Sequence, residues 1–111
     1  MNSGVPWNPS SLKIWRSERR RTIRKIKTDL GCCHCKGRFP HYGLDFHHLD
    51  ASKKTFNISR NMYCAWSTLL KELENCTVLC RICHGGVTCG EVFLSASIRR
   101  AWVYKKSWGW R

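Results

Sequence analysis

The N-terminal third of the chain carries a helical pattern of apolar and polar positions. Between residues 12 and 30, apolar or long side chains recur at intervals of three and four, as on one face of an amphipathic helix. Ser10 or Ser11 can cap its start, and Gly31 stands where a glycine commonly ends a helix. We therefore expect a helix over residues 11–30. The positions that form its stripe are Leu12, Trp15, Arg19, Ile23, Ile26 and Leu30.

Two short strands are predicted further along the chain. Residues 43–50 alternate apolar and polar side chains, which is typical of a strand that ends at His47 and His48. A polar stretch over residues 51–55 predicts a loop. Residues 76–79 read as a second strand that leads into a second cysteine pair.

A second helix is expected between these strands. Ser59 or Asn61 can start it, because both side chains are suited to a helix N-terminus. The apolar positions then repeat with helical spacing, and we expect them to pack in the core. They are Met62, Trp66, Leu69, Leu70 and Leu73.

The two ends of the chain are less regular. Residues 1–9 hold two prolines and predict an extended or disordered lead. Glycines at 85, 86 and 90 oppose a long helix after His84, and residues 92–104 fit a helix or a strand. Residues 102–111 interleave aromatic and basic side chains, which suits stacking on bases, and equally a packed or disordered terminus.

Charge points to a polyanionic partner. The 111 residues are enough for one domain and carry a net charge of +13 with a pI near 9.8. Eight of the twenty Lys and Arg residues fall between Lys13 and Lys27, so the charge is concentrated in the first predicted helix. Nucleic acid is the first candidate partner, and a solvated helix face is the alternative.

The cysteine spacing predicts a metal site. Two Cys-x-x-Cys pairs, Cys32/Cys35 and Cys80/Cys83, supply the four thiolates of a closed tetrahedral zinc site. Cys33 is an alternative partner for Cys35. We expect the other cysteines to be small buried residues, namely Cys64, Cys76 and Cys89.

A secreted disulfide scaffold is the competing explanation for eight cysteines. The first ten residues show no basic stretch followed by an apolar one, as a signal peptide has, and no segment is apolar enough to span a membrane. We therefore expect a reducing, intracellular setting, in which paired Cys-x-x-Cys usually binds metal.

Polar residues left over from the zinc site suggest chemistry. His47 and His48 are adjacent on a strand and point to opposite faces, so one is expected to bind and the other to act. A divalent cation held by His47 and His84, with water and phosphate oxygens, can act as a Lewis acid on a phosphodiester. His48 can then take a proton from the attacking water.

The motifs Leu44–Asp50, Lys54–Ser59 and Asn75–His84 resemble those of the HNH endonucleases, especially small phage-type members with two zinc knuckles. The likeness runs from about Arg19 to Gly85. It implies an α+β, ββα-metal fold stapled by the four-cysteine zinc site, with the basic helix in front. The implied layout is a lead at 1–10, the helix at 11–31, a nuclease core at 32–85 and an extension at 86–111.

The resemblance also implies roles for single residues. His48 matches the general base, and His47 and His84 match the ligands of a catalytic divalent ion such as Mg²⁺ or Mn²⁺. Asn75 matches the asparagine that ties the loop and helps to orient the base. Gly85-Gly86 depart from the charged, helix-favouring residues of many relatives, so we expect a shortened or displaced final helix.

These inferences predict a metal-dependent endonuclease that hydrolyses DNA, most naturally double-stranded, as a monomer or a homodimer. A zinc-stabilised DNA-binding protein without catalysis, either an inactive relative or a regulator, is the alternative, and an RNase would use the same chemistry. The expected nucleic-acid contacts are Arg16, Arg19, Arg20, Arg21, Arg24, Lys25, Lys27, Lys53 and Lys54.

Overall fold

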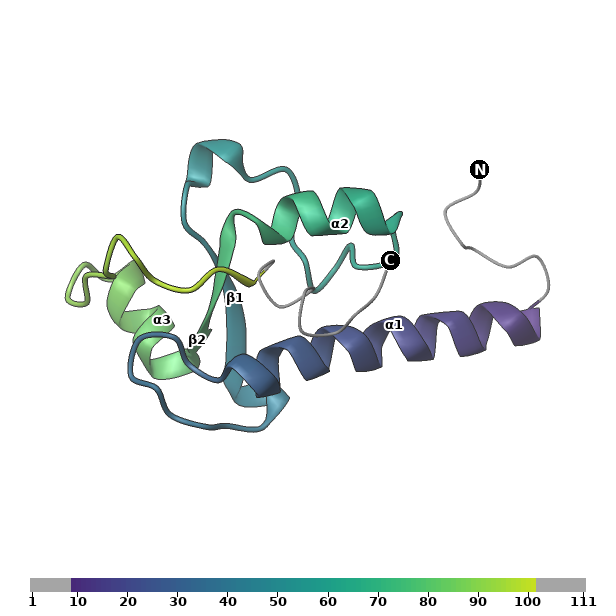
Figure 1. Ribbon diagram of the computed structural model, residues 1–111, viewed down its shortest axis with the longest axis horizontal. Coiled ribbons are helices and arrows are strands. Elements are labelled where there is room, and N and C mark those ends of the chain that lie inside the picture. Colours follow the sequence, from purple (N-terminus) through teal and green to yellow (C-terminus); the bar gives the residue numbers. More distant parts are fainter. Residues whose placement is uncertain (1–8, 102–111) are drawn as a thin grey trace.

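Three α-helices surround one two-stranded antiparallel sheet (Figure 1). The computed structural model of the chain describes residues 9–101, with side chains from Ser11 onward. Within these residues the predicted α+β class is confirmed. The elements in chain order are α1 (Pro9–Leu30), β1 (Leu44–His48), α2 (Trp66–Leu73), β2 (Cys76–Cys80) and α3 (Arg81–Thr88).

Helix α1 begins two residues earlier than predicted and ends where predicted. It starts at Pro9, a residue whose fixed backbone angle and missing N–H suit the first turn of a helix. It ends at Leu30, and Gly31 follows in the left-handed region with φ +64°. The Gly31 amide donates to the Lys27 carbonyl at 2.9 Å, and a Cβ at Gly31 would lie 2.9 Å from the Gly37 carbonyl oxygen. A glycine is therefore needed at this turn.

The two predicted strands pair with each other. Leu44 lies opposite Cys80 and His48 lies opposite Cys76, so the histidine end of β1 meets the start of β2. All five residues of β2 are buried. A short 3-10 turn, Ala51–Lys53, lies within the predicted polar loop after β1.

The predicted start of the second helix is wrong by several residues. Helix α2 begins at Trp66 and not at Ser59 or Asn61. The reason lies in α1, because the Arg19 guanidinium takes the carbonyl oxygens of Met62 and Cys64 as its acceptors. The apolar stripe still packs as expected: Leu69 and Leu73 are fully buried, and the partly buried members are Met62, Trp66 and Leu70.

Two apolar clusters meet at the sheet. The first joins α1 to α2 through Ile23, Ile26, Leu69 and Leu73. The second gathers Leu44 and the strand residues Val78 and Leu79 around four of the cysteines, and Phe46 packs against both clusters. The sheet is therefore covered on both sides, although it has only two strands.

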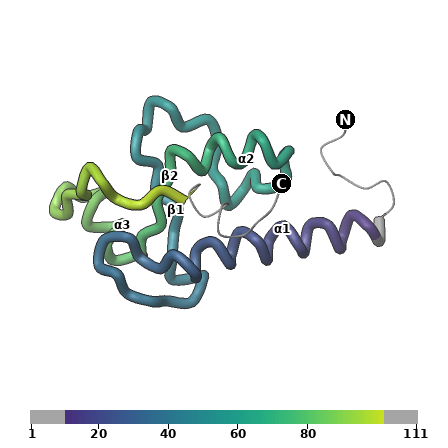
Figure 2. Tube along the Cα trace, in the orientation of Figure 1, coloured from purple at the N-terminus to yellow at the C-terminus, as the bar shows by residue number. Residues whose placement is uncertain are grey.

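Helix α3 continues through Gly85 and Gly86 and ends at Thr88, four residues after His84, so the predicted boundary between residues 85 and 86 falls inside a helix. Residues 92–100 then form neither helix nor strand, and they return to the strands (Figure 2). A Cβ at Gly86 would lie 2.4 Å from a Val92 methyl group, so this glycine allows the returning segment to pack closely. Thr77 donates to the Arg99 carbonyl at 2.6 Å, and Ala101 is buried in the first cluster.

Some predictions lie outside the described residues. They are the extended lead, apart from the end at which α1 begins, and the Trp-rich tail over 102–111. Within residues 9–101, no helix combines the length and the apolar composition that crossing a bilayer requires.

Arg19 is a structural residue, which corrects its prediction as a nucleic-acid contact. Its side chain is only 4% exposed and lies between the rings of Trp15 and Trp66, at 4.9 and 4.3 Å from their centroids. Its hydrogen bonds to Met62 and Cys64 fix the chain before α2 against the middle of α1. A buried guanidinium needs such acceptors, because an unpaired charge in the core is costly.

Replacing Arg19 with Met should lower the free energy of unfolding by about 2–3 kcal/mol, because two buried carbonyls lose a charged donor. Urea unfolding of the zinc-loaded protein, followed by circular dichroism, measures this loss. Arg21→Met is the matched control, since Arg21 is exposed on the same helix. Equal unfolding midpoints for the two variants would contradict the structural role of Arg19.

Candidate functional site

The four cysteines of the two Cys-x-x-Cys pairs come together. Cys32 and Cys35 follow α1, Cys80 ends β2, and Cys83 lies in the first turn of α3. Their sulfur atoms all lie within 4.8 Å of one another. A tetrahedral zinc–thiolate site with bonds of about 2.3 Å has sulfur–sulfur edges of about 3.8 Å, so a small inward movement completes the site. The cluster can therefore hold a structural metal ion such as zinc.

Backbone amides prepare these sulfurs for a cation. The Cys35 amide donates to the Cys32 sulfur at 3.4 Å, and the Cys83 amide donates to the Cys80 sulfur at the same distance. Burial by itself would raise the pKa of Cys32, but hydrogen bonds from backbone amides, among them those of Cys80, Cys35 and His34, outweigh it and lower this pKa to about 6. Metal binds the thiolate, so the lowered pKa of Cys32 favours binding, whereas burial and the neighbouring sulfurs raise the pKa of Cys83.

The remaining cysteines lie outside this cluster. Cys33 is buried and its sulfur faces the Gly31 carbonyl, so Cys32 and not Cys33 accompanies Cys35. Cys76 is buried as predicted, and Cys64 is partly buried. Cys89 is exposed, because it follows the last turn of α3, so the prediction that it is buried is wrong. All eight cysteines are free thiols, which leaves no disulfide scaffold.

A cavity of about 430 Å³ lies where β1 meets α3 and the loop after β1. All three histidines predicted for catalysis or metal binding line it. Its wall also includes one lysine and several polar groups. The lining residues are Asp45, Phe46, His47, His48, Ala51, Lys54, Asn57, Ile58, Ser59 and His84.

His47 and His84 face each other in this cavity. Their ring centroids are 5.2 Å apart, one ring on β1 and the other on α3. The Nδ1 atom of His84 lies 3.1 Å from a carboxylate oxygen of Asp45. A carboxylate only accepts, so Nδ1 carries the proton and Nε2 keeps a lone pair for a ligand. Burial lowers the pKa of His47, as do the neighbouring His84 and His48, which favours the neutral ring that a metal needs.

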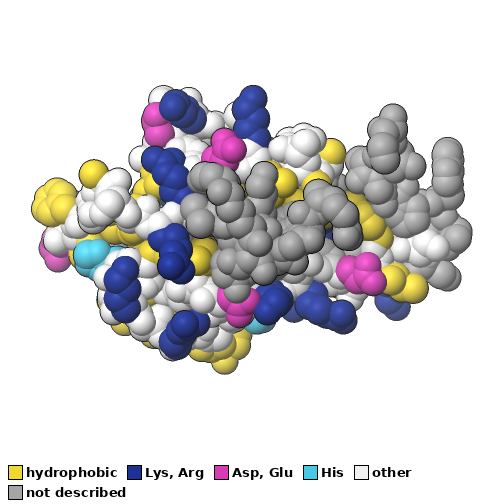
Figure 3. All heavy atoms as spheres, viewed as in Figure 1, with side chains coloured by type: hydrophobic (Ala, Val, Ile, Leu, Met, Phe, Trp, Pro, Cys, Tyr) yellow, Lys and Arg dark blue, Asp and Glu magenta, His cyan; other side chains and the backbone are white. Residues whose placement is uncertain are grey.

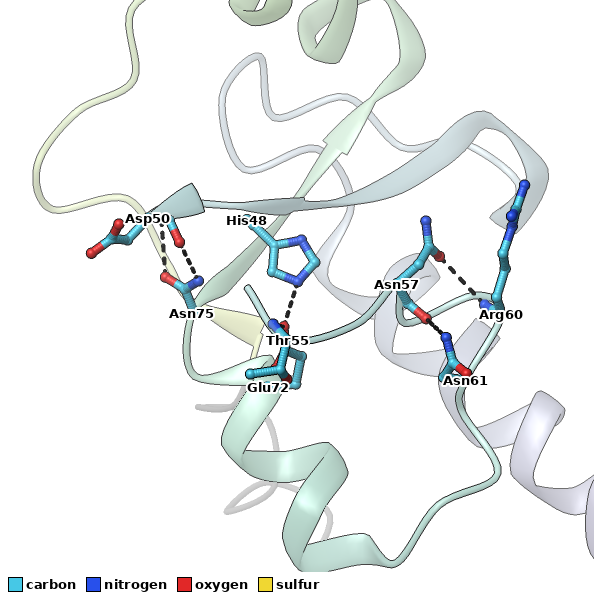
Figure 4. Close-up of polar contacts among 8 residues, drawn as sticks. All are labelled: His48, Asp50, Thr55, Asn57, Arg60, Asn61, Glu72 and Asn75. Atoms are coloured by element: carbon cyan, nitrogen blue, oxygen red, sulfur yellow. Dashed lines mark hydrogen bonds and ion pairs between the residues drawn. The ribbon is translucent and has the colours of Figure 1, made fainter. Parts of the chain in front are cut away.

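His48 turns to the other side of β1 and pairs with Glu72 of α2 (Figure 4). Its Nε2 atom lies 2.8 Å from the Glu72 carboxylate, which also accepts from the amide and the hydroxyl of Thr55. Burial by itself would raise the pKa of Glu72, but the bonds from Thr55 and His48 outweigh it and lower this pKa. Glu72 is therefore ionised at neutral pH.

Asn75 ties the loop after β1 but does not touch the His48 ring. Its side-chain oxygen accepts from the Asp50 amide at 3.0 Å, and its nitrogen donates to the Asp50 carbonyl at 2.8 Å (Figure 4). The expectation that Asn75 ties the loop fits this geometry. The expectation that it also holds the base imidazole does not, because Glu72 occupies that position.

The acidic partners Asp45 and Glu72 were missed from the sequence. Asp45 stands two residues before His47 on a strand, so it shares a face with that histidine, and this spacing was a usable signal. Glu72 adjoins Leu73 and follows Leu69 by three residues, which places a carboxylate on the buried side of α2. Nothing in that spacing identifies His48 as its partner.

Basic side chains lie along α1 and over other elements on the face shown in Figure 3. Arg16, Arg21 and Arg24 are exposed, and Arg20 donates to the Tyr63 hydroxyl at 3.0 Å. Lys27 is less available than predicted, because its ammonium group donates to the Leu44 carbonyl and lies over the Phe46 ring. The other predicted contacts, Lys25, Lys53 and Lys54, are exposed.

A catalytic cation would have few protein ligands here. Among residues 9–101, the four cysteines are the one group of three or more Cys, His, Asp or Glu side chains whose ligand atoms converge. His47 and His84 thus form a pair and not a cage. Mg²⁺ needs few protein ligands, since it keeps several waters and takes further oxygens from substrate phosphate, but two imidazole nitrogens are softer donors than the oxygens that Mg²⁺ and Mn²⁺ prefer.

The function of this chain is inferred from its geometry, because the comparisons with known proteins give no match. No protein-family model matches the chain, and neither a curated protein nor a solved structure does.

Zinc should protect Cys35 from alkylation, because its exposed sulfur has no other shield. With the metal bound, we expect iodoacetamide to modify the equally exposed Cys89 and to leave Cys35 intact; after chelation both should react. Cys76 should stay unmodified until the protein unfolds, since burial raises its pKa to about 12. Mass spectrometry of the labelled peptides measures all three. Equal labelling of Cys35 and Cys89 in zinc-loaded protein would contradict the metal site.

Proposed function

We propose that this chain is a metal-dependent DNA endonuclease of the HNH type, with a structural zinc ion at the four cysteines. The observation that carries the proposal is the cavity in which His47 and His84 face each other beside His48. The order β1, β2, α3 and the place of His84 on α3 agree with the arrangement that the HNH resemblance implies. The basic charge supplies the affinity for a polyanion.

The three histidines and the lysine of the cavity each have a proposed task. His47 and His84 would hold a divalent cation, which when bound supplies a Lewis acid to the scissile phosphodiester. His48 takes a proton from the attacking water. Lys54 contacts a phosphate oxygen at the cavity wall, and Asn75 fixes the loop that carries Lys54 through its two bonds to Asp50.

The structural metal would fix the relative positions of two parts of the chain. Through Cys32 and Cys35 it would bind the turn that follows α1, and through Cys80 and Cys83 it would bind the start of α3. His84 comes directly after Cys83, so the same cross-link holds His84 and the basic helix in one frame. DNA that lies along α1 would then meet the cavity at a set distance.

Purified zinc-loaded protein should nick supercoiled plasmid in Mg²⁺ or Mn²⁺, and His48→Ala should cut about 100- to 10,000-fold more slowly while still binding DNA. His84→Ala should also lose cutting, and a higher concentration of Mn²⁺ should restore part of it. Gel quantification of nicked plasmid measures the rates. His41→Ala is the control, because His41 lies outside the cavity lining. Intact plasmid in every divalent metal, or full cutting by His48→Ala, would refute the nuclease.

Neutralising exposed cations of α1 should weaken DNA binding in a salt-dependent way. The slope of log affinity against log salt is about −0.9 per phosphate contact, so Arg21→Gln with Arg24→Gln should make it less negative by about 1.8. Fluorescence anisotropy with a short duplex at several salt concentrations measures the slope. Lys71→Gln with Arg99→Gln removes the same charge from exposed positions away from α1. An equal loss of slope in both double variants would remove α1 from the interface.

A zinc-stabilised DNA-binding protein without catalysis is the second candidate. It is favoured by one observation, which is that no third protein ligand converges with His47 and His84 among the described residues. This alternative predicts the same salt-dependent binding by α1. It differs in predicting no exchangeable divalent site at the cavity and no cleavage.

A further inference from the structure

The pairing of His48 with Glu72 has a consequence for how the base works. Glu72 is 5% exposed, and its carboxylate accepts from three groups: the His48 ring, the Thr55 amide and the Thr55 hydroxyl. The carboxylate is thus held from two sides, by β1 and by the loop after it. These three hydrogen bonds hold the buried carboxylate in one side-chain conformation.

The geometry selects one tautomer of the imidazole. An ionised carboxylate has no proton to donate, so the His48 Nε2 atom must donate to it at 2.8 Å. The neutral ring then carries its lone pair on Nδ1. Figure 4 shows Nδ1 pointing away from Glu72, and no residue in the described range 9–101 forms a hydrogen bond with it. His48 lines the cavity, so Nδ1 is the ring nitrogen available to a water molecule there.

We propose that Glu72 is the positioning residue of the general base: it fixes His48 with Nε2 protonated and Nδ1 as the proton acceptor, and its charge stabilises the imidazolium formed during hydrolysis. This inference rests on the proposed nuclease function. The same division of labour between a buried carboxylate and a histidine operates in serine hydrolases, where the carboxylate orients the ring and is not itself protonated.

The proton and bond changes balance with water as the only co-reactant. As the water oxygen forms a bond to phosphorus, its O–H bond breaks and the proton moves to His48 Nδ1. The phosphorus–oxygen bond to the leaving group breaks, and the leaving oxygen takes a proton from solvent. The imidazolium then returns its extra proton to solvent. Glu72 makes one hydrogen bond to Nε2 throughout and gains an ion pair while His48 is charged.

Glu72→Gln separates charge from shape. The amide has nearly the volume of the carboxylate, and its oxygen can still accept from Nε2 and from the Thr55 amide. We expect the variant to fold and to bind zinc and DNA, and to nick plasmid about 10- to 1,000-fold more slowly, with the loss in kcat and not in KM. Glu74→Gln is the matched control, because it removes the same charge from an exposed residue. Glu74 follows directly after the last residue of α2.

The tautomer of His48 is a second, independent measurement of the role of Glu72. Two-bond nitrogen–proton NMR spectra of the zinc-loaded protein, without DNA or a second metal, distinguish an Nε2–H ring from an Nδ1–H ring. The His48 signals are assigned by their loss in His48→Gln. We expect the Nε2–H form in the unaltered protein and in Glu74→Gln. Glu72→Ala, if it folds, should show a mixture of the two tautomers.

The outcomes separate this inference from the function beneath it. An Nδ1–H ring in the unaltered protein, or a chain that nicks plasmid equally well with Glu72→Gln and with Glu74→Gln, overturns the role of Glu72 and leaves the nuclease standing. An unaltered chain that cuts no plasmid in any divalent metal overturns the nuclease and with it the catalytic use of the pair. An Nε2–H ring together with slow cutting by Glu72→Gln alone supports the proposal.

Discussion

Convergence of four cysteine sulfurs is the constraint on which the other features depend. The sulfurs come from two turns that are 44 residues apart along the chain, and all lie within 4.8 Å of one another. A chain of this size has a small core, so a metal ion bound by these sulfurs would contribute a large share of the stability. The cluster draws its cysteines from the turn after α1, from β2 and from α3, and these elements carry the basic surface, the buried strand and His84.

Buried charges complete what the cysteines begin. Arg19 joins α1 to the chain before α2, and Glu72 joins α2 to β1 and to the loop at Thr55. Both groups are nearly inaccessible to solvent, and both make hydrogen bonds to other parts of the chain. Charges buried in this way specify one arrangement of their partners, because any other arrangement leaves an ion without acceptors or donors.

The arrangement of histidines in the cavity follows from the way β1 packs between α2 and α3. The strand β1 presents His47 to α3 on one side and His48 to α2 on the other, so neighbouring residues enter different environments. Asp45 and Glu72 then give two of the three histidines of the cavity a carboxylate partner: Asp45 pairs with His84, and Glu72 pairs with His48. In the proposed chemistry, adjacent residues of one short strand would supply a metal ligand and a proton acceptor to the same cavity.

The sequence by itself determined the features that depend on spacing along the chain. The doubled Cys-x-x-Cys motif predicted the sulfur cluster, apolar periodicity predicted α1 and the core face of α2, and Gly31 marked the end of α1. Only the tertiary structure decided which polar groups meet. Arg19 falls on the stripe that faces the core, yet its charge led to its prediction as a nucleic-acid contact, because its acceptors lie more than 40 residues away. Glu72 found His48 across 24 residues, and Gly86 made room for Val92 instead of ending a helix. Periodicity reports which face of an element is buried, whereas the identity of a buried partner depends on how separate elements pack.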